Sequence, residues 1–209
     1  MGEGPAPALI WGPGTMVAMG AMAGGPRDAD PRGAPGALML RSAVPDDVGP
    51  VVALIESAYR GDRSRRGWTT EADLVAGART GPGEVEALIA SPRARMLVAE
   101  LGGTLVGCCG LRPRPGRSAS FGMLAVRPAR QGSGTGRALV GEAERIARDE
   151  WSAERMTIEV ISVRRPLIAW YRRLGYRPTG RTRPFPAELS PVRPGLEFAV
   201  LSKSLNGDR

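Results

Sequence analysis

The sequence predicts a mixed α/β domain whose sheet combines antiparallel and parallel strands. Strand-like and helix-like patterns alternate without a regular strand–helix–strand repeat, which favours a mixed sheet over a fully parallel one. The centre of the chain is rich in strand patterns, and a Gly-Gly pair between two of them predicts a tight hairpin. The chain has 209 residues, 42% of them hydrophobic, which suits one packed domain and a tail.

The first 36 residues are expected to be disordered, and the folded domain is expected over residues 37–209. Stretches such as GEGPAPALIWGPG and GGPRDADPRGAPG are rich in Gly, Pro and Ala and show no periodicity. They do not fit a secretory signal, because Glu3 stands where a basic segment is needed and Gly and Pro interrupt every apolar run. No stretch is long and apolar enough to cross a membrane, so no membrane partner is expected.

In the first half of the domain, capping residues and alternation define the elements. Asp46 or Asp47 is expected to cap the first helix, and Thr70 with Asp73 approximates the capping box of a second. The expected elements are a strand over 38–44, helices over 51–59, 69–78 and 83–90, and strands over 95–101 and 104–111, which flank Gly102 and Gly103.

In the second half, the longest helix is amphipathic. Its apolar stripe contains Leu139, Ala143 and Ile146, with charged residues on the other side. A shorter helix follows, with Pro166 near its start and Gly175 as its stop. The expected elements are strands over 118–126, 155–163 and 195–205, and helices over 137–151 and 165–175.

The residue types that the chain lacks exclude several chemistries. The net charge is +8, there is no histidine, and Lys203 is the only lysine. Without histidine there is no Ser-His or Cys-His pair and no His-ligated metal, so no metal is expected. Cys108 and Cys109 are adjacent, too close for an ordinary disulfide, and fit packing residues on opposite faces of a strand in a reducing cytoplasm. The basic surface favours anionic partners, and a plain solubility surface explains it equally well.

A glycine-rich loop, RQGSGTG, lies between the strand over 118–126 and the amphipathic helix. Backbone N–H groups at such a helix start form an anion site, although glycine loops also serve as plain connections. A Walker loop needs Lys and then Ser or Thr after its last glycine, where this chain has Arg137 and Ala138. A dinucleotide fingerprint needs G-x-G-x-x-G close to the strand end, and here the spacing is G-x-G-x-G. Both patterns fit poorly.

The stretch LAVRPARQGSGTGRAL, residues 124–139, resembles the acetyl-CoA motif of the GNAT N-acetyltransferase superfamily, a strand followed by Q/R-x-x-G-x-G/A. Gln131, Gly134 and Gly136 match that pattern in register. Further along, AWYRRLGY, residues 169–176, resembles the second signature of the family, Y-x-x-x-G-[FY]. The resemblance covers roughly residues 38 to 205. It implies a mixed, mostly antiparallel sheet with splayed central strands flanked by helices.

The resemblance also implies where acetyl-CoA binds. Backbone groups of the strand end would pair with the pantetheine arm, and the N–H groups of the glycine loop would hold the pyrophosphate. Arg164 stands where many relatives have an asparagine that contacts the cofactor, which puts that contact in doubt. The implied cofactor-binding residues are Leu124, Ala125, Val126, Gln131, Gly132, Ser133, Gly134, Thr135, Gly136 and Arg137.

Tyr171 matches the tyrosine of the second signature. The resemblance implies that Tyr171 is the general acid that protonates the departing thiolate. The alternative is that Tyr171 is an aromatic packing residue. A backbone N–H, that of Leu124, is expected at the thioester oxygen. The usual base is missing, because SASFGM contains no acidic residue. Glu159 is the nearest candidate and Glu100 a poorer one, and a water relay is equally open, so no base is assigned.

The expected function is therefore transfer of an acetyl group from acetyl-CoA to a primary amine of a small molecule or protein, in the cytoplasm. Tyr59, Trp68 and Glu71 are candidates for an acceptor pocket, with core packing as the alternative. A non-catalytic CoA sensor is a competing hypothesis. Nucleic acid is not the expected partner, since only 5% of residues are aromatic and the arginine runs are not interleaved with them. The oligomeric state is open, a homodimer included.

A chain beginning at Ala37 tests the expected tail. Sequence rich in Gly and Pro buries too little apolar area to offset its ordering entropy, so the shortened chain should melt within a few degrees of the full chain. Thermal unfolding followed by circular dichroism measures the difference. A loss of more than about 8 °C, which corresponds to about 2 kcal/mol or more in a domain of this size, would show that residues before Ala37 dock on the domain.

Overall fold

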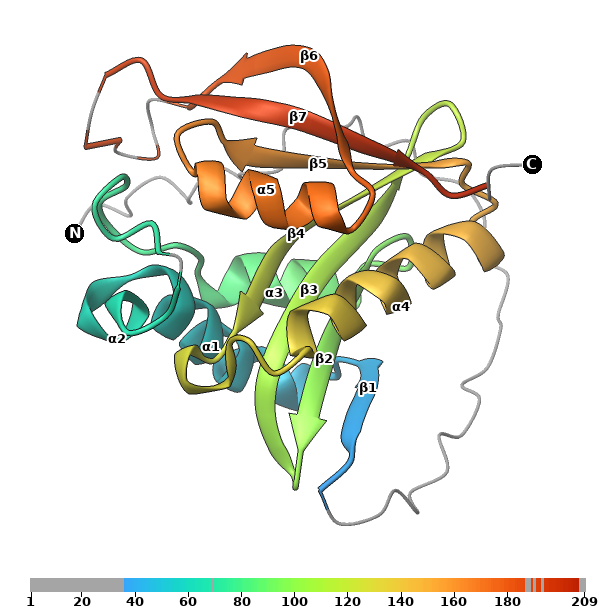
Figure 1. The fold of residues 1–209 in the computed structure, drawn as a ribbon. Helices are drawn as coiled ribbons and strands as arrows, with labels where there is room; N and C mark the ends of the chain where they lie inside the picture. Colours follow the sequence, from blue (N-terminus) through green and yellow to red (C-terminus); the bar gives the residue numbers. More distant parts are fainter. Residues whose placement is uncertain (1–35, 69, 187–188, 190, 193, 207–209) are drawn as a thin grey trace, which may run out of the picture.

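The strands form one twisted sheet with helices on both faces (Figure 1). The computed structural model describes residues 36–68, 70–186, 189, 191–192 and 194–206. The strands are β1 Leu38–Ser42, β2 Arg95–Leu101, β3 Thr104–Arg114, β4 Ser118–Val126, β5 Arg155–Ile161, β6 Arg177–Pro184 and β7 Glu197–Ser204. The helices are α1 Val48–Tyr59, α2 Gly61–Arg65, α3 Pro82–Ala90, α4 Thr135–Asp149 and α5 Arg165–Arg173.

The strand order is β1-β2-β3-β4-β5-β7-β6, and every neighbouring pair is antiparallel except β4 and β5. The predicted hairpin is present, with Leu101 opposite Thr104 across the Gly-Gly turn. The mixed, mostly antiparallel sheet expected from the sequence is confirmed. Within the described part of the chain, no helix is long and apolar enough to span a bilayer.

Two layers of helices bury the two faces of the sheet. In Figure 1, α4 and α5 cover one face, and α1 and α3 cover the other. Cys109 belongs to the core under α4, whereas Cys108 belongs to the core that includes α1 and α3 residues. The adjacent cysteines therefore face opposite sides of β3, as predicted. Both are buried and unpaired.

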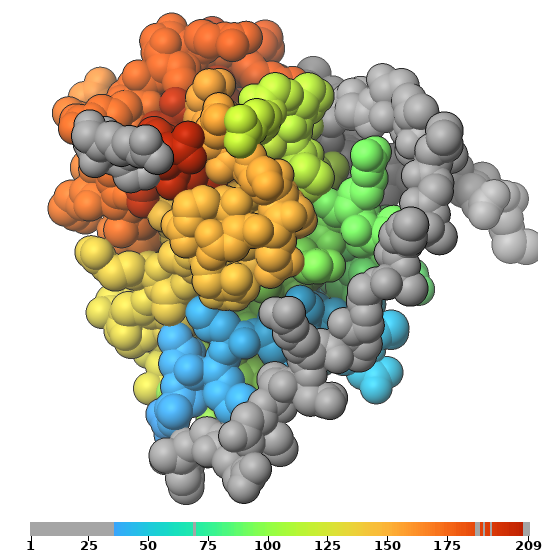
Figure 2. All heavy atoms as spheres, turned by 90° about the vertical axis from the view of Figure 1, so that its right-hand side faces the viewer, coloured from blue at the N-terminus to red at the C-terminus, as the bar shows by residue number. Residues whose placement is uncertain are grey.

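Helix α4 follows the predicted pattern. Leu139, Ala143 and Ile146 are at most 3% exposed and pack on the sheet. On the outer side, Arg145 Nη2 lies 2.7 Å from Glu142 Oε1. Figure 2 shows this outer surface of α4 (yellow to amber) above β1 (blue). Burial of the apolar stripe stabilises the helix, since each fully buried large aliphatic side chain contributes roughly 1.5–3 kcal/mol.

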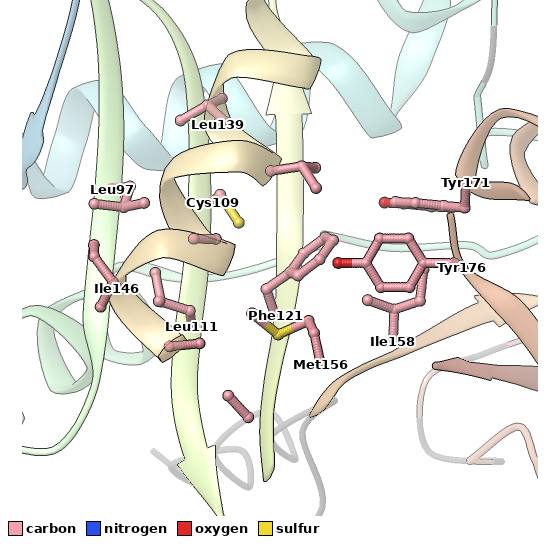
Figure 3. Close-up of a cluster of buried hydrophobic side chains, with 14 of the residues drawn as sticks. Leu97, Cys109, Leu111, Phe121, Leu139, Ile146, Met156, Ile158, Tyr171 and Tyr176 are labelled. Carbon is pink, nitrogen blue, oxygen red and sulfur yellow. The ribbon is translucent and has the colours of Figure 1, made fainter. Parts of the chain in front are cut away.

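Aromatic side chains fill the core beside α4 (Figure 3). The rings of Tyr171 and Tyr176 reach towards Phe121 on β4, with centroids 6.0 Å from it in each case. The Tyr176 hydroxyl donates to Glu144 Oε1 at 2.8 Å, and Lys203 Nζ lies 2.6 Å from Glu144 Oε2. Glu144 thus ties α4 to β7 and to the chain that follows α5.

Strands β4 and β5 part soon after they meet. Their parallel pairing runs only from Ser118 opposite Arg155 to Ser120 opposite Thr157. Beyond that point β4 continues to Val126 beside β3, and β5 continues beside β7. The splayed central strands implied by the family resemblance are therefore present.

A β-bulge adds to the separation. Gly110 pairs with Gly122 and Cys108 pairs with Ala125, so two residues of β4 lie opposite one residue of β3. Met123, in the bulge, has a φ of 49°, which is uncommon for a residue with a side chain. The bulge re-aims β4 where the gap opens.

The prediction of a helix over 69–78 is wrong for residues 70–78. Residue 69 lies outside the described residues. Residues 70–78 form a turn and one isolated bridge at Val75. The Thr70 hydroxyl accepts from the N–H two residues on and caps no helix. Leu74 and Val75 pack against the ends of β5 and β7, and that tertiary contact overrides the local pattern.

The other departures have similar causes. Strand β6 was not predicted, because an edge strand exposed along its whole length has no apolar alternation. The short, polar helix α2 was missed for lack of an apolar face. Asp47 stands at the N-cap of α1 but makes no capping bond; its Oδ2 accepts from Val44 N–H at 2.8 Å and from Arg41 Nη1 at 2.6 Å. The tail predicted over residues 1–36 lies outside the described residues, except for residue 36.

Replacing Asp47 by Asn should destabilise the domain in a pH-dependent way. Hydrogen bonds from Arg41, then the bond from Val44, lower the pKa of Asp47 against the opposing effect of burial. A carboxyl group whose pKa is lower in the folded than in the unfolded chain stabilises the folded state at pH values above its unfolded pKa. This stabilisation is lost as the pH falls through its pKa in the folded state. Asp47→Asn should cost about 1–2 kcal/mol at pH 7, and the difference should shrink below about pH 4. Urea unfolding at several pH values measures it; a difference that does not change with pH would contradict this role.

Candidate active site

Two cavities occupy the gap between β4 and β5 and meet at its centre. The first has a volume of ≈ 250 Å³ and lies over the glycine loop and the end of β4. The second, of ≈ 120 Å³, lies between the facing edges of β4 and β5. The residues that line both are Tyr59, Leu124, Arg164, Leu167 and Tyr171. Because they share these residues, the two cavities adjoin at the β4 bulge.

The glycine loop presents unpaired donors to the first cavity. Gly132 and Gly134 have φ angles of 85° and 90°, which L-residues with side chains rarely adopt. Across the described residues, the N–H groups from Gly134 to Arg137, and that of Gly132, have no hydrogen-bond acceptor. These donors stand at the positive end of the α4 dipole. The glycine loop therefore groups several unpaired N–H donors at one helix N-terminus.

Gln131 joins the glycine loop to the opposite wall of the first cavity. Its Nε2 donates to the Val126 carbonyl at 3.2 Å, and its Oε1 accepts from Trp68 N–H at 2.9 Å. A Cβ on Gly67 would overlap the Gln131 side chain, so this close approach requires glycine. Trp68 in turn lies 6.5 Å from Trp170, measured between ring centroids. Gln131 thus positions the loop after α2 over the cavity.

The structure brings most of the predicted cofactor residues together. Those that line the first cavity are Leu124, Val126, Gln131, Gly132, Gly134, Gly136 and Arg137. Ala125 points away, into the core that includes α1 residues. The hydroxyls of Ser133 and Thr135 lie 3.0 Å apart and bond within the loop. Of the predicted acceptor residues, Tyr59 lines both cavities, Trp68 the first and Glu71 the second.

Tyr171 lies where the two cavities meet. Its ring is 6% exposed, and its hydroxyl makes no hydrogen bond to any described residue. Burial, reinforced by the neighbouring Tyr59, raises the pKa of Tyr171 well above its ordinary value, so the hydroxyl keeps its proton at neutral and mildly alkaline pH. Tyr59 plays a different role, because its hydroxyl donates to the Leu124 carbonyl at 2.7 Å and fixes the bulge. Tyr171 thus presents a protonated hydroxyl where the linings of the two cavities overlap.

Arginines surround the buried Glu71 beside the second cavity. Its carboxylate contacts Arg164 Nη1 at 2.5 Å, Arg60 Nη1 at 3.3 Å and Arg79 Nε at 3.6 Å. Arg79 also lies over the Tyr59 ring, 5.0 Å from its centroid. Arg164, at the asparagine position of the family pattern, is therefore held by Glu71. The network joins the start of α5 to the loop before α3.

Glu159, the nearest base candidate from the sequence, lines the second cavity and is paired with Arg183 at 2.7 Å. Glu100 lies elsewhere, on β2, with its carboxylate 2.8 Å from Arg41 Nε. Sequence reasoning missed Arg79 and Arg114, which also line the second cavity. Arg79 lies in an irregular loop with no motif, and only the folded chain shows that it reaches this cavity.

The sequence was compared with known protein families. The family described as acetyltransferase (GNAT) matches residues 57–176, more than half of the chain. The chain belongs to the GNAT acetyltransferase family. The matched segment contains both cavities' central residues, from Tyr59 to Tyr171, together with the glycine loop. The comparison with curated proteins gave no significant match.

Solved structures of GNAT acetyltransferases share the fold. The ribosomal-protein-S18-alanine N-acetyltransferase of Escherichia coli is 13% identical, with a TM-score of 0.61 over 83% of this chain and 97% of that one. The structure of yncA from Salmonella typhimurium with its cofactor acetyl-CoA is 18% identical (TM-score 0.60; 83% and 96%). A Vibrio cholerae spermidine N-acetyltransferase SpeG chimera with hSSAT is also 18% identical (TM-score 0.59; 80% and 95%). Since the acceptors named there differ, the fold leaves the acceptor open.

Gly134→Ala tests the anion site. A Cβ at φ 90° strains the loop and displaces N–H donors, so acetyl-CoA affinity should fall at least tenfold by calorimetry. Gly103→Ala is the matched control, because Gly103 also has a positive φ (73°) and no atom within 4 Å of the added Cβ, and it lines neither cavity. Equal affinity in the two folded variants would exclude the loop as the binding site.

Proposed function

We propose that this protein transfers an acetyl group from acetyl-CoA to a primary amine, by direct attack in a ternary complex. The observation that supports it best is the meeting of the two cavities at Leu124 and Tyr171. One cavity carries an anion-binding loop and the other is a separate compartment between two strands. This arrangement suits two substrates that react at their point of contact.

The first cavity fits acetyl-CoA. The unpaired N–H groups of the glycine loop suit the pyrophosphate, and Arg137 on the first turn of α4 adds positive charge. The parted edge of β4 suits an extended arm with amide groups, which binds as an added strand would. When bound, acetyl-CoA supplies an activated acetyl thioester, which an amine converts to an amide with release of a thiol.

Two groups of this chain then act at the junction. The bulge places the Leu124 backbone at the meeting point, where its N–H is the proposed donor to the carbonyl oxygen. The Tyr59 hydroxyl holds the Leu124 carbonyl and so fixes the orientation of this peptide. Tyr171 holds a proton at its hydroxyl for the departing thiolate, and its raised pKa keeps that proton in place.

The cysteines support direct transfer over an acyl-cysteine route. Burial raises the pKa of Cys108 to about 12 and that of Cys109 well above its ordinary value. A thiol held in its neutral form is a poor nucleophile, and neither cysteine lines either of these two cavities. Their unpaired state also supports the proposal that the enzyme works in the reducing cytoplasm.

Deprotonation of the amine is assigned to solvent. Both carboxylates that line the second cavity, Glu71 and Glu159, are engaged with arginines. The rate should therefore rise with pH as the acceptor amine itself loses its proton. An ordinary tyrosine loses its proton near its pKa of about 10. Because burial raises the pKa of Tyr171 above that value, the rate should not fall through deprotonation of Tyr171 at this pH.

Tyr171→Phe tests the acid. The substitution keeps the ring and its packing, so folding and acetyl-CoA affinity should change little, while kcat should fall on the order of a hundredfold to ten-thousandfold. The loss should shrink with an acyl donor whose leaving group has a lower pKa, since that group needs no acid. Stopped-assay rates with each donor measure both effects.

Tyr176→Phe is the control. Tyr176 shares the same core and loses a hydrogen bond to Glu144, but it lines neither cavity, so stability should fall while kcat changes less than about threefold. If Tyr171→Phe also turns over within a few-fold of the wild type, the acid is another group. If acetyl-CoA binds and no amine is acetylated, the protein is a CoA sensor.

A further inference from the structure

The second cavity has more positive than negative charge. Its lining contains the guanidinium groups of Arg79, Arg114 and Arg164 and the carboxylates of Glu71 and Glu159. Two more arginines outside the lining, Arg60 and Arg183, already contact these carboxylates. Five guanidinium groups thus lie in or beside this lining, against two carboxylates. Buried charge of one sign is costly unless a counter-charge approaches it.

Arg79 carries the clearest sign of a missing partner. It is 8% exposed, and its Nη1 is buried with no hydrogen-bond partner among the described residues. Its contact with Glu71 is made through Nε at 3.6 Å, beyond a good hydrogen bond. A buried charged donor without an acceptor is energetically unfavourable. An anion in the second cavity would satisfy it.

Arg114 supplies a second guanidinium group to the same cavity. It ends β3, is half-buried, and makes no ion pair or hydrogen bond within the described part of the chain. Arg79 and Arg114 line the second cavity only, whereas Tyr171 lines both. Arg79 and Arg114 therefore belong to the part of the lining that the first cavity does not share.

We propose that the acceptor is a small amine that carries a carboxylate or a comparable oxyanion, which Arg79 and Arg114 bind while the amine faces Tyr171. This inference rests on the proposed acetyl transfer and names its substrate class. The planar guanidinium group can donate two parallel hydrogen bonds to a carboxylate. These bonds are strongest where both groups are partly removed from water. The apolar lining from Phe121, Ile158 and Phe198 adds room for a hydrocarbon side chain.

The same charges disfavour polycationic acceptors. Spermidine, the acceptor named for one structural relative, would meet arginines and two carboxylates that are already paired. Like charges in a partly buried site repel such a ligand and lower its affinity. The relative's fold is the same, so the difference in acceptor would lie in these side chains.

Initial rates with matched acceptors test the proposal. The panel contains the free amino acids, their carboxamides, amidated peptides that begin with Asp or Glu, and spermidine. We expect kcat/KM for the favoured acid to exceed that of its carboxamide at least tenfold, with spermidine lower still. The peptides distinguish a free amino acid from a peptide N-terminus as the source of the anion.

Arg114→Gln identifies the site. It should raise KM for the acid about tenfold and leave the rate with the carboxamide nearly unchanged, so that the preference collapses. Arg79→Lys, which keeps the charge and loses the planar fork, is the second variant. Arg117→Gln is the control, since Arg117 is exposed on the same hairpin, pairs with Glu154 and lines neither cavity.

A binding measurement separates the two proposals. N-acetyl amino acids should raise the melting temperature of the wild type and of Arg117→Gln, but not that of Arg114→Gln. If neutral or cationic amines are acetylated as well as acids, the anion proposal is wrong and acetyl transfer stands. If no amine reacts but N-acetyl amino acids bind through Arg114, acetyl transfer is wrong and the anion site stands. If they do not bind, the anion site is wrong.

Discussion

The parting of β4 and β5 is the constraint on which the site depends. A strand that leaves its neighbour gives up ladder hydrogen bonds, and such groups must find other partners. Here each strand keeps a full neighbour on its other side: β5 pairs with β7 from Arg155 to Ile161, and β4 pairs with β3 up to Val126. The sheet therefore stays continuous while its centre opens, and both cavities lie in that opening.

Polar contacts beside the opening fix the positions of the segments that line it. The Tyr59 hydroxyl on α1 binds the bulge at Leu124, and Glu71 binds Arg164 at the start of α5. These contacts connect segments more than 60 residues apart, so they form only when the domain has folded. The buried ion pair costs desolvation and contributes position more than stability. The arginines it gathers give the second cavity its charge.

The sequence was sufficient for the elements with strong periodicity. The stripe of α4 and the Gly-Gly hairpin were predicted because the residues that define them lie close together in the chain. The glycine loop was placed by motif, and the structure explains it through the positive φ angles of Gly132 and Gly134. Edge strand β6 was missed because nothing in an exposed strand reports its pairing.

Long-range geometry was beyond prediction from the sequence. The residues over 69–78 have a helical pattern, but Leu74 and Val75 pack on the far end of the sheet, which no local signal shows. Gln131 was predicted to contact a cofactor; the structure adds its bond to Trp68, which depends on Gly67 having no side chain. The partners of Glu71 come from three separate loops or helix ends, and only folding brings them together.

The Glu144 contact to β7 has a chemical consequence for a member of an acetyltransferase family. Acetyl-CoA, the proposed acetyl donor, can also acetylate lysine side chains. This chain has one lysine, Lys203, and its ammonium group is held 2.6 Å from Glu144 and 5.7 Å from the Tyr176 ring centroid. The ion pair with Glu144 and the contact with the Tyr176 ring hold this side chain against the domain. Arginine stands at every other Lys/Arg position, so the amine of this one held lysine is the only lysine amine that the chain offers to an acetyl donor.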